Sequence, residues 1–351
     1  MRLDAQGSQV LEAKELVVAG DRQVLRDAVY CPKLDEFCVA SAAPDGVLLS
    51  CSTEGDTWSQ MAYPGFSAAT ILCDANVRSI VLYTDDFDDA TGSIRYAGHS
   101  NRNGWEEWFL EKKCTGASSQ INHFSVQDGA GIIAYEDACG LDCSSTWVAH
   151  RLAEIGQIGS QTCLSDPLGL RVGASFQSAH PSKPLFTYSS TFRDVDGFIR
   201  ARNHVVLLGE DGEVVQAPLT EGRAYFPFGD DSLLIIRRFG EGARTRFRRC
   251  GMEGECLTAG SDIVIESFRR VHSLSVNDDF AIMGTRGSEN GPIPWAWLFN
   301  SSMELEEHGP VHNDARAVGR TESSGALRSL LVGPCSDAPE NFCASIEALD
   351  W

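Results

Sequence analysis

The feature that most constrains the fold is a repeat of short apolar or alternating segments. Gly, Asp, Asn and Pro separate these segments roughly every 8–12 residues, a spacing typical of all-β proteins. The segments recur in sets of four, whose first members lie near residues 29, 70, 123, 172, 225, 271 and 317. The six steps between them range from 41 to 53 residues. A four-stranded unit of this length is what one blade of a β-propeller requires.

The two ends of the chain suggest how such a ring would close. The seventh set has only three segments, while the apolar run in residues 9–18 belongs to no set. We therefore predict a single domain over residues 1–351, an all-β, seven-bladed β-propeller of four-stranded antiparallel blades. In this prediction residues 9–18 supply the outermost strand of the last blade, so that no raw sheet edge remains there. A six-bladed propeller and two packed β-sandwiches are the alternatives.

The chain contains 12 cysteines, and eight of them form four closely spaced pairs that flank turn-like stretches. Two antiparallel strands joined by such a turn place facing Cα atoms about 4.5–5.5 Å apart, which is within disulfide range. We predict a disulfide in each pair, namely Cys31–Cys38, Cys139–Cys143, Cys250–Cys256 and Cys335–Cys343. The remaining cysteines pair over longer spans that the sequence does not fix: Cys51, Cys73, Cys114 and Cys163. Scattered buried thiols are the alternative, because the spacings match no zinc motif.

Disulfides at this density favour an oxidising, extracytoplasmic compartment, whether secreted, periplasmic or at the cell surface. The first eight residues contain no apolar signal region. We therefore expect a mature chain in which Met1 stands where a signal or anchor segment preceded it.

The charge balance narrows the classes of partner. The 29 basic residues stand against 49 acidic ones, for a formal net charge of −20. Such a surface disfavours nucleic acid, whose phosphates need basic partners, and it disfavours anionic lipid equally. The longest strongly apolar run, residues 233–236, is far shorter than the ~20 residues of a membrane-spanning helix. We expect a monomer with no nucleic-acid partner and no membrane insertion.

Residues 50–58 read Ser-Cys-Ser-Thr-Glu-Gly-Asp-Thr-Trp. This segment resembles the Asp-box, Ser-x-Asp-x-Gly-x-Thr-Trp, of sialidase-like (BNR-repeat) β-propellers. Gly55 and Trp58 occupy their positions in the motif, whereas Thr53 replaces its aspartate and Cys51 its serine. Residues 100–108 resemble the same motif more loosely, with one extra residue.

The resemblance implies a structural turn between the third and fourth strands of a blade. Many non-enzymes share this motif, and the chain lacks the Arg-Ile-Pro stretch of sialidases. It therefore supports a propeller fold, and we transfer no catalytic residue. Tryptophan at a fixed position of a blade more often packs between neighbouring sheets, so we expect Trp58 and Trp108 to pack there.

The most acidic loop of the chain joins the second and third segments of the second set. It contains four aspartates within five residues: Asp85, Asp86, Asp88 and Asp89. Closely spaced carboxylates can converge on a hard cation, so we predict these four as ligands of Ca²⁺, the one cofactor that the sequence suggests. The alternative is that Asp is common in turns because it bonds its own backbone.

Two further groups of residues are candidates for ligand contact. Trp295 and Trp297 lie two residues apart beside a Pro-rich loop and would share one strand face. Six arginines lie between residues 237 and 249, and among them Arg237 and Arg246 are predicted to bind an anionic group. The alternatives are packing of the tryptophans between sheets and pairing of the arginines with acidic loops.

These features favour a secreted or surface-exposed recognition propeller. It would bind a protein or glycan ligand through its loop-rich acidic face, with Ca²⁺ as a candidate component. No convergent nucleophile or acid–base set is visible in the sequence, which favours a non-enzymatic protein. The alternative is a glycan-active hydrolase or lyase that uses paired carboxylates from different blades.

Overall fold

The computed structural model is built almost entirely of β-strands. It describes residues 2–3, 9–12, 16–19, 25–66, 68–74, 77–83, 93–100, 104–111, 121–127, 130–136, 147–152, 158–163, 171–179, 185–208, 214–219, 224–228, 232–239, 244–251, 256–260, 262–273, 279–322, 325–339, 341–349 and 351. Between residues 72 and 233 only the backbone is described, apart from the turn 194–198. Within the described residues, no helix has the length and apolar character needed to cross a bilayer.

The described strands form seven antiparallel sheets in chain order. The first sheet contains β4 (Leu25–Cys31), β5 (Glu36–Ala43), β6 (Gly46–Ser52) and β7 (Thr57–Pro64), extended by β2 (Gln9–Glu12) and β1 (Arg2–Leu3). The second contains β8 (Ala68–Asp74), β9 (Val77–Tyr83), β10 (Ser93–Ser100) and β11 (Gly104–Glu111). The third contains β12 (Ile121–Gln127), β13 (Ala130–Glu136), β14 (Trp147–Leu152) and β15 (Ile158–Cys163).

The remaining sheets follow the same pattern. The fourth contains β16 (Arg171–Ala179), β17 (Leu185–Arg193), β18 (Ile199–Leu208) and β19 (Val214–Leu219). The fifth contains β20 (Ala224–Phe228), β21 (Ser232–Phe239), β22 (Arg244–Gly251) and β23 (Cys256–Thr258), with β24 (Ile263–Val264) also beside β22. The sixth contains β25 (Ser267–Ser273), β26 (Phe280–Arg286), β27 (Ile293–Phe299) and β28 (Leu305–Pro310). The seventh contains β29 (Ala315–Arg320), β30 (Leu327–Pro334), β31 (Phe342–Ala348) and β3 (Leu16–Ala19).

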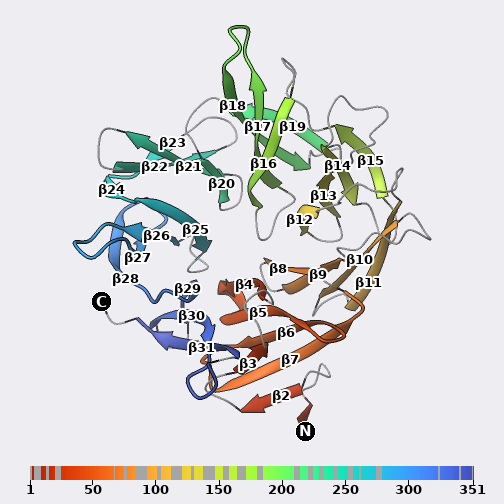
Figure 1. Ribbon diagram of the computed structural model, residues 1–351, viewed down its shortest axis with the longest axis vertical. Helices are drawn as coiled ribbons and strands as arrows, with labels where there is room; N and C mark the ends of the chain where they lie inside the picture. Colours follow the sequence, from red (N-terminus) through yellow and green to blue (C-terminus); the bar gives the residue numbers. More distant parts are fainter. Residues whose placement is uncertain are drawn as a thin grey trace.

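Figure 1 shows these sheets arranged around a common centre, with the first strand of each sheet innermost. Innermost strands of successive sheets contact each other, as β4 and β8 do, and β29 of the last sheet contacts β4 of the first. The all-β architecture of four-stranded antiparallel units, predicted from the spacing of turns, is confirmed.

The N-terminal segment differs from its prediction. Residues 9–18 were expected to form one strand of the last sheet, but β2 pairs with β7 of the first sheet and β3 pairs with β31 of the last. Leu16 lies opposite Ala344, and its side chain is buried in a cluster that includes Trp58 and Ala317. The segment divides because Leu16 is buried where the first and last sheets meet, while the preceding residues cover the outer edge of β7.

Apolar side chains fill the space between neighbouring sheets. Between the fifth and sixth sheets, Phe299 stacks on Phe280 with ring centroids 5.1 Å apart and contacts Phe247 at 5.6 Å. All three rings are fully buried, together with Leu234 and Ile282. These buried rings form the core between the fifth and sixth sheets.

The first and last sheets meet closely at Tyr30 of β4. Its ring lies against Gly319 of β29, where a Cβ atom would overlap the ring. The Tyr30 hydroxyl shares its hydrogen between the carbonyl oxygen of Arg320, 2.8 Å away, and Oδ1 of Asp35, 3.0 Å away. Burial and the neighbouring Asp35 carboxylate raise the pKa of Tyr30 well above its usual range. Tyr30 thus stays neutral and links the two sheets.

The turn that resembles an Asp-box lies between β6 and β7, the third and fourth strands of its sheet. Gly55 adopts a φ of 88°, and its N–H donates to the Ser52 hydroxyl over 2.9 Å. The Trp58 indole N–H donates to the carbonyl oxygen of Gly55 over 3.0 Å, and the side chain is fully buried. The predicted packing of Trp58 is confirmed, while the side chain of Trp108 lies outside the described residues.

Three disulfides join described cysteines. Cys250–Cys256 and Cys335–Cys343 are bonded as predicted. The predicted Cys31–Cys38 bond is wrong, because Cys38 pairs instead with Cys51, its direct neighbour across β5 and β6.

The turn after β4 explains this error. The 3-10 helix Pro32–Leu34 closes the turn, so Cys31 lies opposite Glu36 and Cys38 lies opposite Val29. Cys31 is itself disulfide-bonded, to a cysteine other than Cys38. Cys139 and Cys143 lie outside the described residues.

Thiol counting tests this oxidised state. Unfolded but unreduced protein is expected to yield far fewer than 12 reactive thiols, and peptide mapping is expected to recover the Cys38–Cys51 link. Reducing the short Cys250–Cys256 and Cys335–Cys343 loops is expected to cost up to about 2–3 kcal/mol each in the chain-entropy description. A titration close to 12 thiols would contradict the oxidised assignment.

Candidate ligand-binding surface

Trp295 is the more accessible of the two tryptophans that were predicted to contact a ligand. It lies on β27, opposite Gly284 of β26 and Pro310 of β28, near the end of the sixth sheet. The guanidinium carbon of Arg286 lies 4.8 Å from the centre of the indole ring, and the His308 ring lies 5.9 Å from it. Trp295 is half-buried, whereas Arg286 and His308 are exposed. The attraction between a guanidinium and an indole face holds this arginine over the ring.

Arg286 is exposed and stacked on the Trp295 ring. None of the carboxylates in the described part of the chain forms an ion pair with it. The turn that follows is fixed by paired backbone hydrogen bonds of 3.1 Å between Ser288 and Gly291. A cation stacked on an aromatic ring keeps its N–H groups directed outward, which suits a carboxylate or another planar acceptor.

Trp297 lies on the same face of β27 as Trp295 but is buried. Only 3% of its surface is exposed, and it packs in the cluster between the fifth and sixth sheets. A Cβ atom at Gly284 would lie 2.6 Å from the carbonyl oxygen of Ser267 and 3.5 Å from the Trp297 ring, so this position requires glycine. Trp297 thus occupies the packing role that the sequence left as its alternative, and Trp295 stays the candidate for contact with a ligand.

The predicted arginines lie on the fifth sheet. Arg246 of β22 is exposed, and its Nε donates to Oδ1 of Asp262 over 2.6 Å. Arg237 occupies the position opposite Arg246 on β21, but its side chain lies outside the described residues. The pairing with Asp262 matches the alternative that a neighbouring carboxylate offsets the positive charge.

The predicted calcium ligands Asp85, Asp86, Asp88 and Asp89 lie outside the described residues, and their role stays a prediction. In the described part of the chain, one group of metal-ligating residues is close enough to share an ion: Glu36, Cys38 and Cys51. The two sulfur atoms of this group are joined in a disulfide, so neither can serve as a thiolate ligand.

The residue pattern did not indicate that Arg286 and His308 lie beside Trp295. Arg286 lies nine residues before Trp295, and only the register of the β26–β27 hairpin brings the two together. His308 reaches Trp295 through β28, whose pairing with β27 shifts at an irregularity between Leu298 and Phe299. No residue pattern in the sequence encodes either offset.

Neither a family profile nor a curated protein matches this sequence. Among solved structures, the β-propeller domain of the Trilobed protease from Pyrococcus furiosus, which has an open velcro topology, aligns with a TM-score of 0.50 at 9% identity. The alignment covers 93% of this chain and 98% of that domain. The fold is that of a β-propeller.

Two further structures align over part of their own length. The acylaminoacyl peptidase of Pyrococcus horikoshii aligns with a TM-score of 0.51 at 10% identity, over 93% of this chain and 51% of the peptidase. A eukaryotic initiation factor aligns at 10% identity with a TM-score of 0.39, over 78% of this chain and 62% of that one. At such identities the likeness to the two Pyrococcus structures concerns the fold alone and leaves activity open.

Proposed function

We propose that this chain is an extracytoplasmic recognition propeller. In the proposal its sheets are seven blades, the ring closes through β3 on β31, and a protein or glycan ligand binds at the loop-rich face. The observation that carries the proposal is the exposed Arg286 stacked over Trp295 at the end of the sixth sheet.

The chemistry of this pair suits recognition. Tryptophan and arginine are the side chains that most often dominate binding energy, since they combine a large apolar area with directed hydrogen bonds. Trp295 packs against the buried cluster that contains Trp297, so its side chain has little conformational entropy to lose when a ligand binds. The exposed His308 adds a second nitrogen group beside the ring.

The disulfides support the proposed compartment. Cross-links between neighbouring strands persist in oxidising surroundings and are rare where thiols are kept reduced. In the same proposal, the acidic loop that contains Asp85 and Asp86 forms a Ca²⁺ site on the loop-rich face.

A binding screen tests the proposal. The purified chain is presented to a panel of glycans and peptides, and the best binder is titrated against Arg286→Gln and Trp295→Phe. Loss of a charge-assisted hydrogen bond is expected to weaken binding by Arg286→Gln about tenfold or more.

Arg320→Gln provides the matched control, because Arg320 is a partly exposed arginine of the seventh sheet that contacts Glu306 and Glu307. The proposal is wrong if Arg286→Gln and Trp295→Phe bind the ligand as tightly as the unaltered chain. Hydrolysis of a glycoside in the panel by the purified chain would instead favour the hydrolase alternative.

A further inference from the structure

A row of three arginines lies along β22 of the fifth sheet. Arg244, Arg246 and Arg248 occupy alternate positions and are exposed or half-buried, whereas the intervening Thr245 and Phe247 are buried. Successive side chains of a strand point to opposite faces, so the three arginines share one face. We call these three residues the arginine row.

The arginine row faces away from the Trp295 surface. Phe247, on the other face of β22, packs against Phe299 of the sixth sheet with ring centroids 5.6 Å apart. The next residue on that face, Arg249, reaches the sixth sheet through a 3.4 Å hydrogen bond to the carbonyl oxygen of Ser301. Trp295 belongs to the sixth sheet, so the two surfaces lie on opposite sides of β22.

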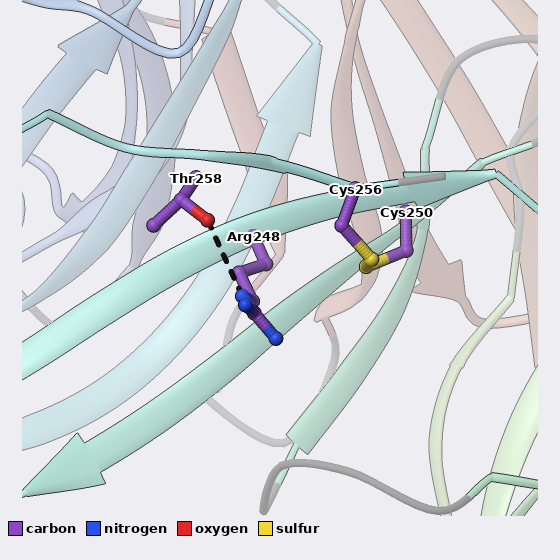
Figure 2. The surroundings of a disulfide bond; sticks show 4 residues. All are labelled: Arg248, Cys250, Cys256 and Thr258. Carbon is purple, nitrogen blue, oxygen red and sulfur yellow. Dashed lines mark hydrogen bonds between the residues drawn. A yellow bond between two sulfur atoms is a disulfide. The ribbon is translucent and has the colours of Figure 1, made fainter. Parts of the chain in front are cut away.

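Neighbouring groups hold two members of the row, Arg246 and Arg248, in place. Asp262 accepts a hydrogen bond from Arg246, and the Thr258 hydroxyl accepts one from Arg248 over 3.3 Å. Figure 2 shows Arg248 beside Thr258, next to the disulfide that joins Cys250 to Cys256. This disulfide holds β23 against β22, so a covalent link fixes the strand that supports Arg248. Guanidinium groups held in advance lose less entropy on binding.

The charge of the whole chain limits the size of the ligand. Alternate residues of a strand repeat about every 6.6–6.8 Å, so the row spans roughly 13 Å from Arg244 to Arg248. The chain as a whole carries a net charge of −20, and that charge repels any anion that extends well beyond the row. At physiological salt this repulsion acts over about 8 Å, which favours a short ligand with a few anionic groups.

The backbone of β22 argues against a peptide ligand. An extended peptide is usually recognised by pairing with a free strand edge. β22 has no such edge, since β21 pairs with it on one side and β23 and β24 pair with it on the other. A ligand of the arginine row would therefore contact side chains and not the backbone of β22. The geometry of guanidinium groups matches that of sulfate and carboxylate groups.

We infer that the arginine row binds a short acidic oligosaccharide, whose sulfate or carboxylate groups contact Arg244, Arg246 and Arg248. The choice of a glycan rests on the proposed extracytoplasmic function, but the site is separate from Trp295. Asp262 competes with the ligand for Arg246, since it occupies one edge of that guanidinium.

Calorimetry with a fully sulfated heparin tetrasaccharide tests the inference. The unaltered chain is expected to bind this probe, to bind it more weakly at 300 mM than at 50 mM NaCl, and to leave the desulfated tetrasaccharide unbound. The combined Arg244→Gln, Arg246→Gln and Arg248→Gln variant is expected to lose at least tenfold in affinity. Asp262→Asn, which removes the competing carboxylate, is expected to bind several-fold more tightly.

Controls separate this site from the Trp295 surface. Arg320→Gln and Arg286→Gln are expected to bind the sulfated probe as the unaltered chain does, and the single variant Arg244→Gln gives a readout that does not depend on the folding of the triple variant. Undiminished binding by Arg244→Gln and the triple variant would overturn the inference, as would equal binding of the desulfated sugar or tighter binding of a hexaglutamate peptide. Loss of binding in Arg286→Gln alone would overturn it too, and would leave the proposed function standing.

Discussion

Replacing Gly319 by alanine is expected to lower the free energy of unfolding by about 3 kcal/mol. The added methyl group would overlap the ring of Tyr30, which is buried and held by its hydroxyl contacts with Arg320 and Asp35. Neither the backbone of β29 nor this ring can move without separating the first and last sheets. Chemical denaturation followed by tryptophan fluorescence measures the loss.

Gly260→Ala is the matched control. A Cβ atom at Gly260 meets no atom within 4 Å, and this glycine is exposed. The control is therefore expected to change stability by less than about 0.5 kcal/mol. Equal stability of the Gly319 and Gly260 variants would contradict the tight contact between the first and last sheets.

Deleting residues 1–18 is expected to lower the melting temperature and cause association. The deletion removes nearly all of β3, exposes the outer edge of β31 and withdraws the Leu16 side chain from its cluster. Burial of a leucine side chain contributes about 1.5–3 kcal/mol, and an open edge strand is a template for pairing with another chain. Calorimetry and light scattering report the two effects separately.

Deletion of residues 1–8 serves as the comparison, because it removes β1 while retaining β2 and β3. This shorter deletion is expected to leave the melting temperature and the oligomeric state nearly unchanged. If the chain without residues 1–18 is as stable and as monomeric as the full chain, pairing of β3 with β31 does not contribute to closure.

The spacing of turns was enough to predict the sheets, because a four-stranded meander needs a turn after each strand of fixed length. The chain places Gly and Asp at such points, as in the hairpin of β5 and β6, which Pro44-Asp45 closes directly before Gly46. The segment that resembles an Asp-box likewise marked a turn correctly, since Gly55 supplies the positive φ that the turn needs. Turns can be predicted from the sequence, because their backbone conformation depends on residues that are neighbours in the chain.

Contacts that depend on the register between paired strands could not be predicted from the sequence. The Cys31–Cys38 assignment failed because a short 3-10 helix, centred on residues that also suit an ordinary turn, shifted which residues face each other. The Trp295 surface was found in part, since its aromatic residues were visible but their burial was not. Arg286 and Asp262 reach their partners through pairing between strands, which a single sequence does not encode.

The partner of Leu16 is synthesised about 328 residues after it, since Leu16 pairs with Ala344. At about 5–20 residues per second, synthesis leaves β3 without its partner strand for roughly 16 to 66 s. During that interval the apolar segment at the start of the chain has no partner strand. A chaperone that binds this segment would protect the nascent chain from aggregation. The timing of the last strand, more than the stability of any one sheet, would then set how much of the newly made protein reaches its final form.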